Sequence, residues 1–110
     1  MAESAPFEEH DLADLTLQRL QPLAGSAFSV ALPAPWNLRL VLAEVSPLAH
    51  QTSFTGAFRA PFRLIFHGPA QPVHPQATLP LDHPVLGRNE IFLVPIGPDA
   101  QGQRYQAIFS

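Results

Sequence analysis

The ten residues 90–99, Glu-Ile-Phe-Leu-Val-Pro-Ile-Gly-Pro-Asp, constrain the fold more than any other part of the sequence. They contain its longest apolar run, which Gly97 and Pro98 end abruptly. A continuous run rich in β-branched and aromatic residues is typical of a strand that is buried on both faces. The sequence therefore predicts that residues 91–96 form a central strand with neighbours on both sides.

Five further segments alternate between apolar and other side chains, as half-buried strands do. They span residues 26–32, 37–45, 61–67, 77–83 and 104–109. A short helix near residues 16–20, restarting at Pro22 and ending at Gly25, is expected to plug one open end of the sheet. No helix separates successive strands, so parallel crossovers are excluded. The sequence predicts an all-β fold, a small six-stranded antiparallel barrel or sandwich with one short N-terminal helix.

The core of this fold is predicted from the inward positions of the alternating segments. Eight Phe residues and a hydrophobic content of 46% are enough to fill one modest core in a chain of 110 residues. The expected core side chains are Phe28, Leu40, Phe62, Leu64, Phe66, Phe92 and Phe109.

The first fourteen residues differ from the rest in charge. They carry five carboxylates and no Lys or Arg, whereas residues 15–110 carry six Arg against four carboxylates, a balance of +2. We expect residues 1–14 to be a flexible acidic extension, with residues 1–10 disordered, and residues 15–110 to be a single β domain. A balance of +2 is too weak for a nucleic-acid interface, so no nucleic-acid partner is predicted.

Cysteine content and apolar runs bear on the redox chemistry and the cellular location of the protein. The chain has no Cys, which excludes disulfides and thiolate metal ligands. No apolar run approaches the roughly 20 residues of a membrane-spanning helix, and no basic-then-apolar signal pattern opens the chain. We expect no membrane span and synthesis in the cytoplasm, with leaderless export left open.

Three histidines, His67, His74 and His83, could approach one another and hold a metal ion, but their spacings of seven and nine residues match no compact ligand motif. Ser53, Asp82 and His83 could be drawn as a hydrolase triad. Adjacent strand residues point to opposite faces, however, and no nucleophile elbow is present. We therefore predict no catalytic, cofactor-binding or metal-binding residues, and no cofactor.

Contacts to a protein partner are predicted instead. Pro80 cannot donate to a ladder, which places residues 77–83 at a sheet edge or a bulge, where a partner could dock. Aromatic side chains in loops are the other candidates, because such groups anchor interfaces; the alternative is that they fold back as lids over the barrel ends. The predicted partner-binding residues are Trp36, Phe54, Phe58, Leu79 and Leu81.

Four segments carry a resemblance to a known family. They are residues 62–69 (FRLIFHGP), 81–84 (LDHP) and 91–98 (IFLVPIGP), and Arg104-Tyr105 near the C-terminus. From Leu15 onward the chain is similar to a bacterial family of small single-domain proteins of unknown function. It departs from the family at Ala77 and Leu79, where Gly and Tyr are usual. The resemblance implies a gene neighbourhood shared with phage tail-collar-like proteins.

Three classes of function follow. The leading hypothesis is a non-enzymatic protein-interaction or structural accessory module, and the resemblance implies a phage-tail-like or fibre assembly as its setting. A small-ligand-binding barrel would require an internal cavity, which eight Phe residues argue against. A small metal-dependent hydrolase is the third.

Overall fold

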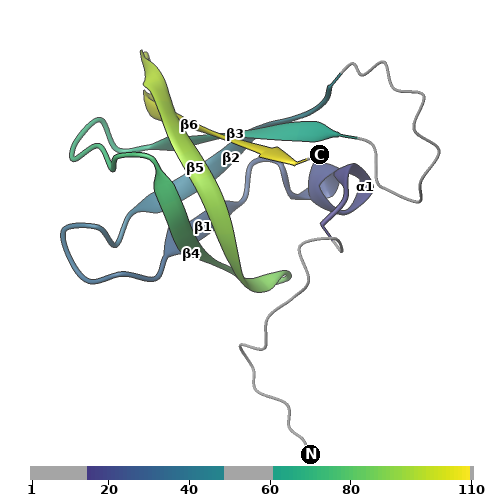
Figure 1. The fold of residues 1–110 in the computed structure, drawn as a ribbon, viewed down its shortest axis with the longest axis horizontal. Helices are drawn as coiled ribbons and strands as arrows, with labels where there is room; N and C mark the ends of the chain where they lie inside the picture. The colour runs from purple at the N-terminus through teal and green to yellow at the C-terminus, as the bar shows by residue number, and fades with distance from the viewer. Residues whose placement is uncertain (1–14, 49–60, 110) are drawn as a thin grey trace, which may run out of the picture.

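The computed structural model describes residues 15–48 and 61–109 (Figure 1). Its elements are α1 (Leu17–Leu20), the 3₁₀ helix η2 (Gln21–Leu23), β1 (Ala27–Val30), β2 (Arg39–Pro47), β3 (Phe62–Gly68), β4 (Ala77–His83), β5 (Gly87–Asp99) and β6 (Gly102–Phe109). The strands form a closed antiparallel barrel in the order β1-β2-β3-β6-β5-β4. The predicted all-β fold with one short helix is confirmed, and it is a barrel rather than a sandwich. No helix in the described ranges is long and apolar enough to cross a membrane.

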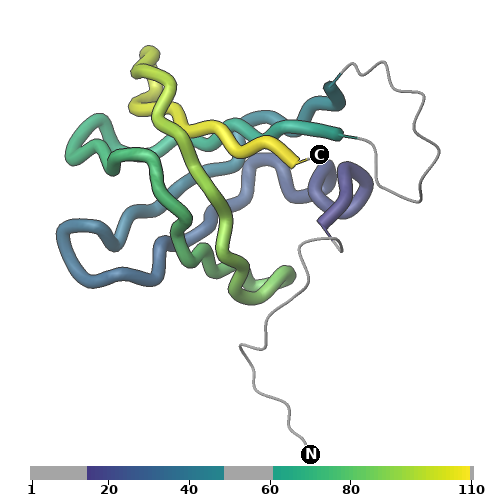
Figure 2. Tube along the Cα trace, in the orientation of Figure 1, coloured from purple at the N-terminus to yellow at the C-terminus, as the bar shows by residue number. Residues whose placement is uncertain are grey.

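The two ends of the barrel differ (Figure 2). At one end, which we call the loop end, lie the loops of residues 31–38 and 69–76 and the turn between β5 and β6. At the other, the helix end, lie α1, η2 and the turn of residues 84–86. Leu20 of α1 is 1% exposed and belongs to the core cluster, so the short helix does plug this end.

Local sequence explains where the helix begins and ends. The side chain of Thr16 accepts a hydrogen bond from the backbone N–H of Arg19, which satisfies one of the free donors at the helix start. Pro22 lies in the first turn of η2, where its missing N–H costs little. Gly25 follows the helix and has a φ of +92°, a conformation that glycine adopts readily.

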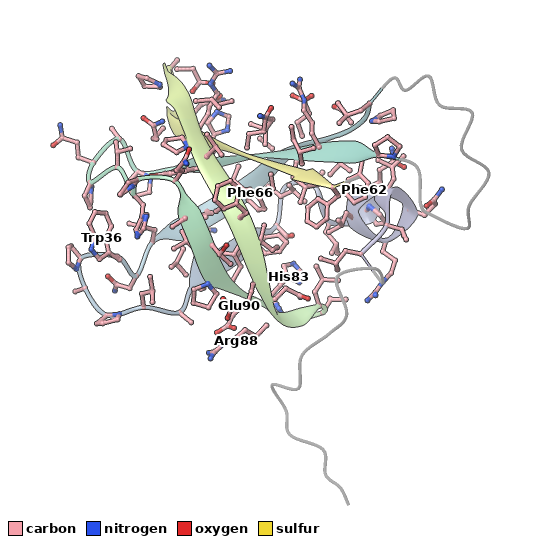
Figure 3. The ribbon with its side chains drawn as sticks, viewed as in Figure 1. Trp36, Phe62, Phe66, His83, Arg88 and Glu90 are labelled. Atoms are coloured by element: carbon pink, nitrogen blue, oxygen red, sulfur yellow. The ribbon has the colours of Figure 1, made fainter. Side chains whose placement is uncertain are left out.

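Aromatic side chains fill the interior. Phe28 and Phe66 meet edge to face with ring centres 5.2 Å apart, and Phe62 and Phe109 stack at 4.9 Å. Phe62 and Phe66 lie between the walls of the barrel in Figure 3. Six of the seven predicted core residues are confirmed as buried: Phe28, Leu40, Phe62, Leu64, Phe66 and Phe109.

Phe92, the seventh, was predicted wrongly. Its side chain is 51% exposed, and burial along this part of β5 alternates, with Ile91 and Leu93 buried and Glu90 exposed. The strand does have neighbours on both sides, β4 and β6. In a closed barrel each strand turns one face to the core and one outward, and no described element covers the outer face of β5 at Phe92. Residues 91–96 are therefore not buried on both faces.

The edge-strand prediction for β4 needs a similar correction. β4 pairs with β5 along its whole length and closes the barrel with β1 through the pairs Ser29–Asp82 and Val30–Leu81. Leu79 and Leu81 are 3% and 1% exposed, because they occupy the inward positions of the strand. Their side chains contribute to the core, so they are not surface groups that a partner could touch.

Candidate functional site

A cavity lies on the outer face of the barrel, over β2, β3 and the hairpin of β5 and β6. We call it the His67 cleft; its volume is about 500 Å³. Its lining residues are Gly25, Val41, Leu42, Ala43, Glu44, Ile65, His67, Asp99, Gln101 and Arg104. Two β-bulges shape it, since the register shifts in β2 between Leu42 and Glu44 and in β5 between Pro95 and Gly97. Bulges bend strands and redirect side chains, and they are frequent beside functional sites.

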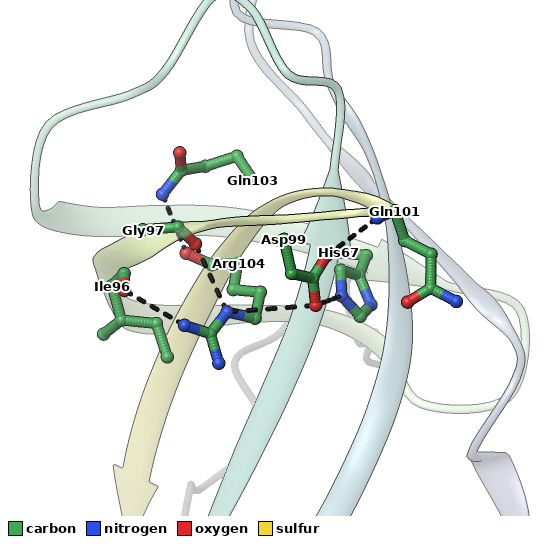
Figure 4. Close-up of polar contacts among 7 residues, drawn as sticks. All are labelled: His67, Ile96, Gly97, Asp99, Gln101, Gln103 and Arg104. Carbon is green, nitrogen blue, oxygen red and sulfur yellow. Dashed lines mark hydrogen bonds and ion pairs between the residues drawn. The ribbon is translucent and has the colours of Figure 1, made fainter.

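His67 and Asp99 form the central contact of the cleft (Figure 4). Nε2 of His67 donates to Oδ2 of Asp99 over 2.8 Å, and the other carboxylate oxygen accepts the backbone N–H of Gln101 at 2.9 Å. These two hydrogen bonds, with that of His67 the larger effect, hold the pKa of Asp99 below its ordinary value. Asp99 is therefore a fixed carboxylate that orients the imidazole ring.

Arg104 lies beside this pair and is fixed by the bulge in β5. Its Nε donates to the carbonyl of Gly97 at 3.3 Å and its Nη2 to the carbonyl of Ile96 at 3.4 Å. Its ion pair with Asp99 is long, 4.0 Å. Within the described residues, no hydrogen bond uses Nη1 of Arg104 or Nδ1 of His67.

Glu44 is the second carboxylate of the cleft, and it already has partners. It accepts hydrogen bonds from the hydroxyl of Ser46 and from Nη2 of Arg63, the latter at 3.1 Å. The Ser46 hydroxyl is the larger cause, ahead of Arg63, of a pKa below the ordinary value for Glu44.

His83 and Ser26 lie within hydrogen-bond distance, 2.9 Å, at the helix end. Nδ1 of His83 accepts the backbone N–H groups of Val85 and Leu86, so the ring proton is on Nε2 and is donated to Ser26. The Ser26 hydroxyl donates in turn to the carbonyl of Leu23. In this arrangement the imidazole has no free lone pair with which to accept the serine proton. His83 is 5% exposed, and this burial lowers its pKa, which favours the neutral ring.

Asp82 points away from His83, as the alternation of the strand requires. It faces outward and binds Arg88 through two hydrogen bonds of 2.7 and 3.0 Å. A second surface cavity, about 330 Å³ in volume, lies beside this pair. Ser53, the third member of the triad considered above, lies outside the described residues.

Trp36 lies at the loop end (Figure 3), and its ring contacts that of His74. Their rings are 4.5 Å apart and nearly perpendicular, and Trp36 is half-buried. The backbone N–H of His74 donates to the hydroxyl of Tyr105, whose ring is in the core. Val73, next to His74, is 41% exposed. A buried tyrosine thus ties this pair of loop residues to the barrel.

The predicted site residues are therefore dispersed. His67, His74 and His83 occupy three different environments, and the described ranges hold no group of three His, Cys, Asp or Glu side chains that could bind a metal ion. Phe54 and Phe58 lie outside the described residues. Sequence reasoning missed the partnership of His67 with Asp99 and Arg104. The only signal for it was the Gly-Pro-Asp turn after the apolar run, and that turn does not reveal which strand it faces.

A family model matches residues 15–109 of the chain, and that family, DUF6916, is described as a domain of unknown function. Neither the curated proteins nor the solved structures contain a significant match.

Proposed function

The chain belongs to the DUF6916 family of domains of unknown function, and we propose that it is a non-enzymatic protein-interaction module. In this proposal the loop end binds an apolar segment of a protein partner. Trp36 is the anchor of the contact, and Val73 adds to the same surface.

The observation that carries the proposal is the way Trp36 is held. The indole and the His74 ring form a T-shaped contact, and the backbone N–H of His74 donates to the hydroxyl of the buried Tyr105. A large amphipathic side chain that is already ordered loses little entropy on binding. Tryptophan is also among the residues that contribute most to binding at protein interfaces. A half-buried, preordered Trp36 therefore suits an anchor.

The filled interior argues against a ligand-carrying barrel. Phe28, Phe62 and Phe66 are 2% exposed or less, and their rings pack against aromatic neighbours in the barrel. The two cavities described above open on outer surfaces. The direction of the hydrogen bonds at Ser26 and His83 likewise supports a structural role for the pair rather than a nucleophile and its base.

The resemblance noted in the sequence suggests which assembly the partner belongs to. We propose a larger bacterial structure of the phage-tail or fibre type, in which this domain is an accessory subunit. On this view the chain is synthesised in the cytoplasm and leaves the cell, if at all, with the assembly.

The test compares three immobilised baits in an extract of the native host: wild type, Trp36→Ala and Val85→Ser. Val85 is 69% exposed in the turn of residues 84–86 at the helix end, so it controls for the loss of any exposed apolar group. Circular dichroism first verifies that all three are folded. A protein recovered by wild type is then purified, and its affinity for each variant is measured by calorimetry.

The loss of a binding hot spot weakens affinity by about tenfold or more. We expect such a loss for Trp36→Ala and none for Val85→Ser. Equal affinity for all three baits would disprove the role of the loop end. Turnover of an ester or phosphate by wild type that is lost in His67→Ala would replace the proposal with an enzymatic function.

A further inference from the structure

We propose that the turn of residues 84–86, between β4 and β5, is a pH-sensitive element, which neutral His83 holds closed and which is released when the imidazole takes up a proton. Release carries Leu86, which is 3% exposed, out of the core at the helix end. The turn lies at the other end of the barrel from the loop that carries Trp36, so the element is independent of the function proposed above.

The imidazole holds the turn through its Nδ1 atom. Nδ1 of His83 accepts the backbone N–H of Val85 at 3.0 Å and that of Leu86 at 3.4 Å. An imidazole nitrogen can accept a hydrogen bond only while it carries no proton, and in the imidazolium both nitrogens are donors. A proton on Nδ1 would therefore face two N–H groups, and both hydrogen bonds would be lost.

Little else in the described residues holds the backbone of this turn. Nδ2 of Asn89 donates to the carbonyl of Leu86 at 3.3 Å, so His83 supplies two of the three described side-chain hydrogen bonds to the turn. The side chain of Val85 is 69% exposed and packs little against the barrel. Protonation of His83 thus removes most of what fixes the turn.

The other edge of the ring keeps its contacts in both protonation states. Nε2 donates to Ser26 whether or not Nδ1 is protonated, and the ring lies against Phe28 with centres 4.5 Å apart. Proton uptake therefore acts on the turn and leaves the contact of His83 with β1 in place.

The charged side chains of the surrounding elements face outward. Asp82 and Arg88, on β4 and β5, bind each other on the outer face, and Glu90 of β5 and Arg19 of α1 are exposed. β1 and η2 contain no charged residue. Burial alone lowers the pKa of His83, so the ring takes up a proton more readily once the turn is released into water. Proton uptake and release of the turn therefore favour each other.

Nuclear magnetic resonance on the full-length protein tests this element. The ring of His83 and the backbone amides of Val85, Leu86 and Tyr105 are followed from about pH 7.5 to about pH 5.0. Carboxylates whose pKa lies below the ordinary value stay ionised over this range, so they do not contribute to the response.

We expect the amides of Val85 and Leu86 to shift with the same midpoint as the ring of His83. Their heteronuclear NOE values should fall at the same pH, because a released turn moves on the picosecond-to-nanosecond timescale. Tyr105 is buried in β6, and its amide should keep its shift and its NOE. The difference between these amides separates release of the turn from global unfolding.

His83→Asn is the matched control. The amide oxygen of Asn can accept the two N–H groups in place of Nδ1, as in an Asx turn, but it does not titrate. The turn of this variant should stay ordered over the whole pH range. His67→Gln removes an imidazole on the outer face of β3 and should leave the response of the turn unchanged.

Ser26→Ala keeps the proposal falsifiable if His83→Asn does not fold. It removes the partner of Nε2 and leaves Nδ1 in place, so the ring of His83 and the amides of Val85 and Leu86 must still share one midpoint. Different midpoints would overturn the proposal. So would a ring that stays neutral throughout, a protonated ring beside unchanged turn amides, simultaneous changes at Tyr105, or release of the turn in His83→Asn.

Discussion

Two phenylalanines, Phe66 of β3 and Phe92 of β5, should respond very differently to truncation. Phe66 is fully buried and packs edge to face against Phe28, whereas Phe92 is 51% exposed on the outer face of β5. From the sequence alone, each belonged in the core. In the structure only Phe66 is buried, and the change in the free energy of unfolding on truncation measures this difference in burial.

The expected magnitudes follow from burial. Phe66→Ala removes a buried ring and leaves a cavity that the surrounding aromatic residues cannot fill, which costs about 3–5 kcal/mol. Full burial of a Phe side chain is worth about 1.5–3 kcal/mol. Phe92 is buried by about half, and its removal opens no enclosed cavity, so Phe92→Ala should cost about 1 kcal/mol.

Urea denaturation of wild type, Phe66→Ala and Phe92→Ala gives the two differences directly. In a domain of this size 1 kcal/mol corresponds to about 4 °C in Tm. Phe66→Ala should therefore melt about 12 °C or more below wild type, and Phe92→Ala about 4 °C below it. Unchanged m-values would show that the denatured states are comparable. A loss for Phe92→Ala that exceeds half of the loss for Phe66→Ala would refute the assignment of inner and outer faces in β5.

Two further predictions concern a buried imidazole and a glycine. Burial lowers the pKa of His83 below its ordinary value of 6.5, so the unfolded chain takes up that proton first as the pH falls. The stabilisation from neutral His83 is complete above about pH 6.5 and is lost below it, while the carboxylates with lowered pKa act only below about pH 4.5. Melting at about pH 7.5 and about pH 5.5 should show a drop in wild type that shrinks in His83→Phe, and a flat wild-type profile would count against it. At Gly102, with a φ of +131°, an added Cβ would lie 2.2 Å from the carbonyl oxygen of Gly68, whereas nothing lies within 4 Å of one at Gly97. Gly102→Ala should therefore lower Tm more than Gly97→Ala, and equal losses would show that strain in φ alone governs both.

The alternation of side chains was enough to predict the strands and most of the core. Phe28, Leu40 and Leu64 were predicted correctly as core residues. In a sheet with a single core, apolar residues at every second position identify the face that points inward. The apolar run of β5 was ambiguous, since an outward Phe92 and an inward Phe92 give the same sequence. Burial of apolar groups is a one-way rule, and an exposed phenylalanine breaks no local preference.

The His67 cleft could not be predicted, because it depends on register. His67 meets Arg104 across β3 and β6, and Arg104 meets the carbonyls of β5 only because a bulge shifts the pairing after Pro95. Bulges insert one residue and leave no reliable mark in a single sequence. Pro80 is a second example in which the pairing of strands could not be predicted. It indicates a strand with an interrupted ladder, but it does not reveal that β1 closes the barrel there.

The short pairing between β1 and β4, here called the join, is the place where the closed barrel can open most easily. Beyond the pair Val30–Leu81, a single described hydrogen bond, from Ala31 to the carbonyl of Pro80, continues this join toward the loop end. Local opening costs least where the fewest backbone hydrogen bonds must break, so amide exchange should be fastest along this line. The loop that carries Trp36 leaves β1 at this point. Local opening of the pairing between β1 and β4 would therefore move the indole of Trp36 relative to His74, while the hairpin of β5 and β6 keeps its position.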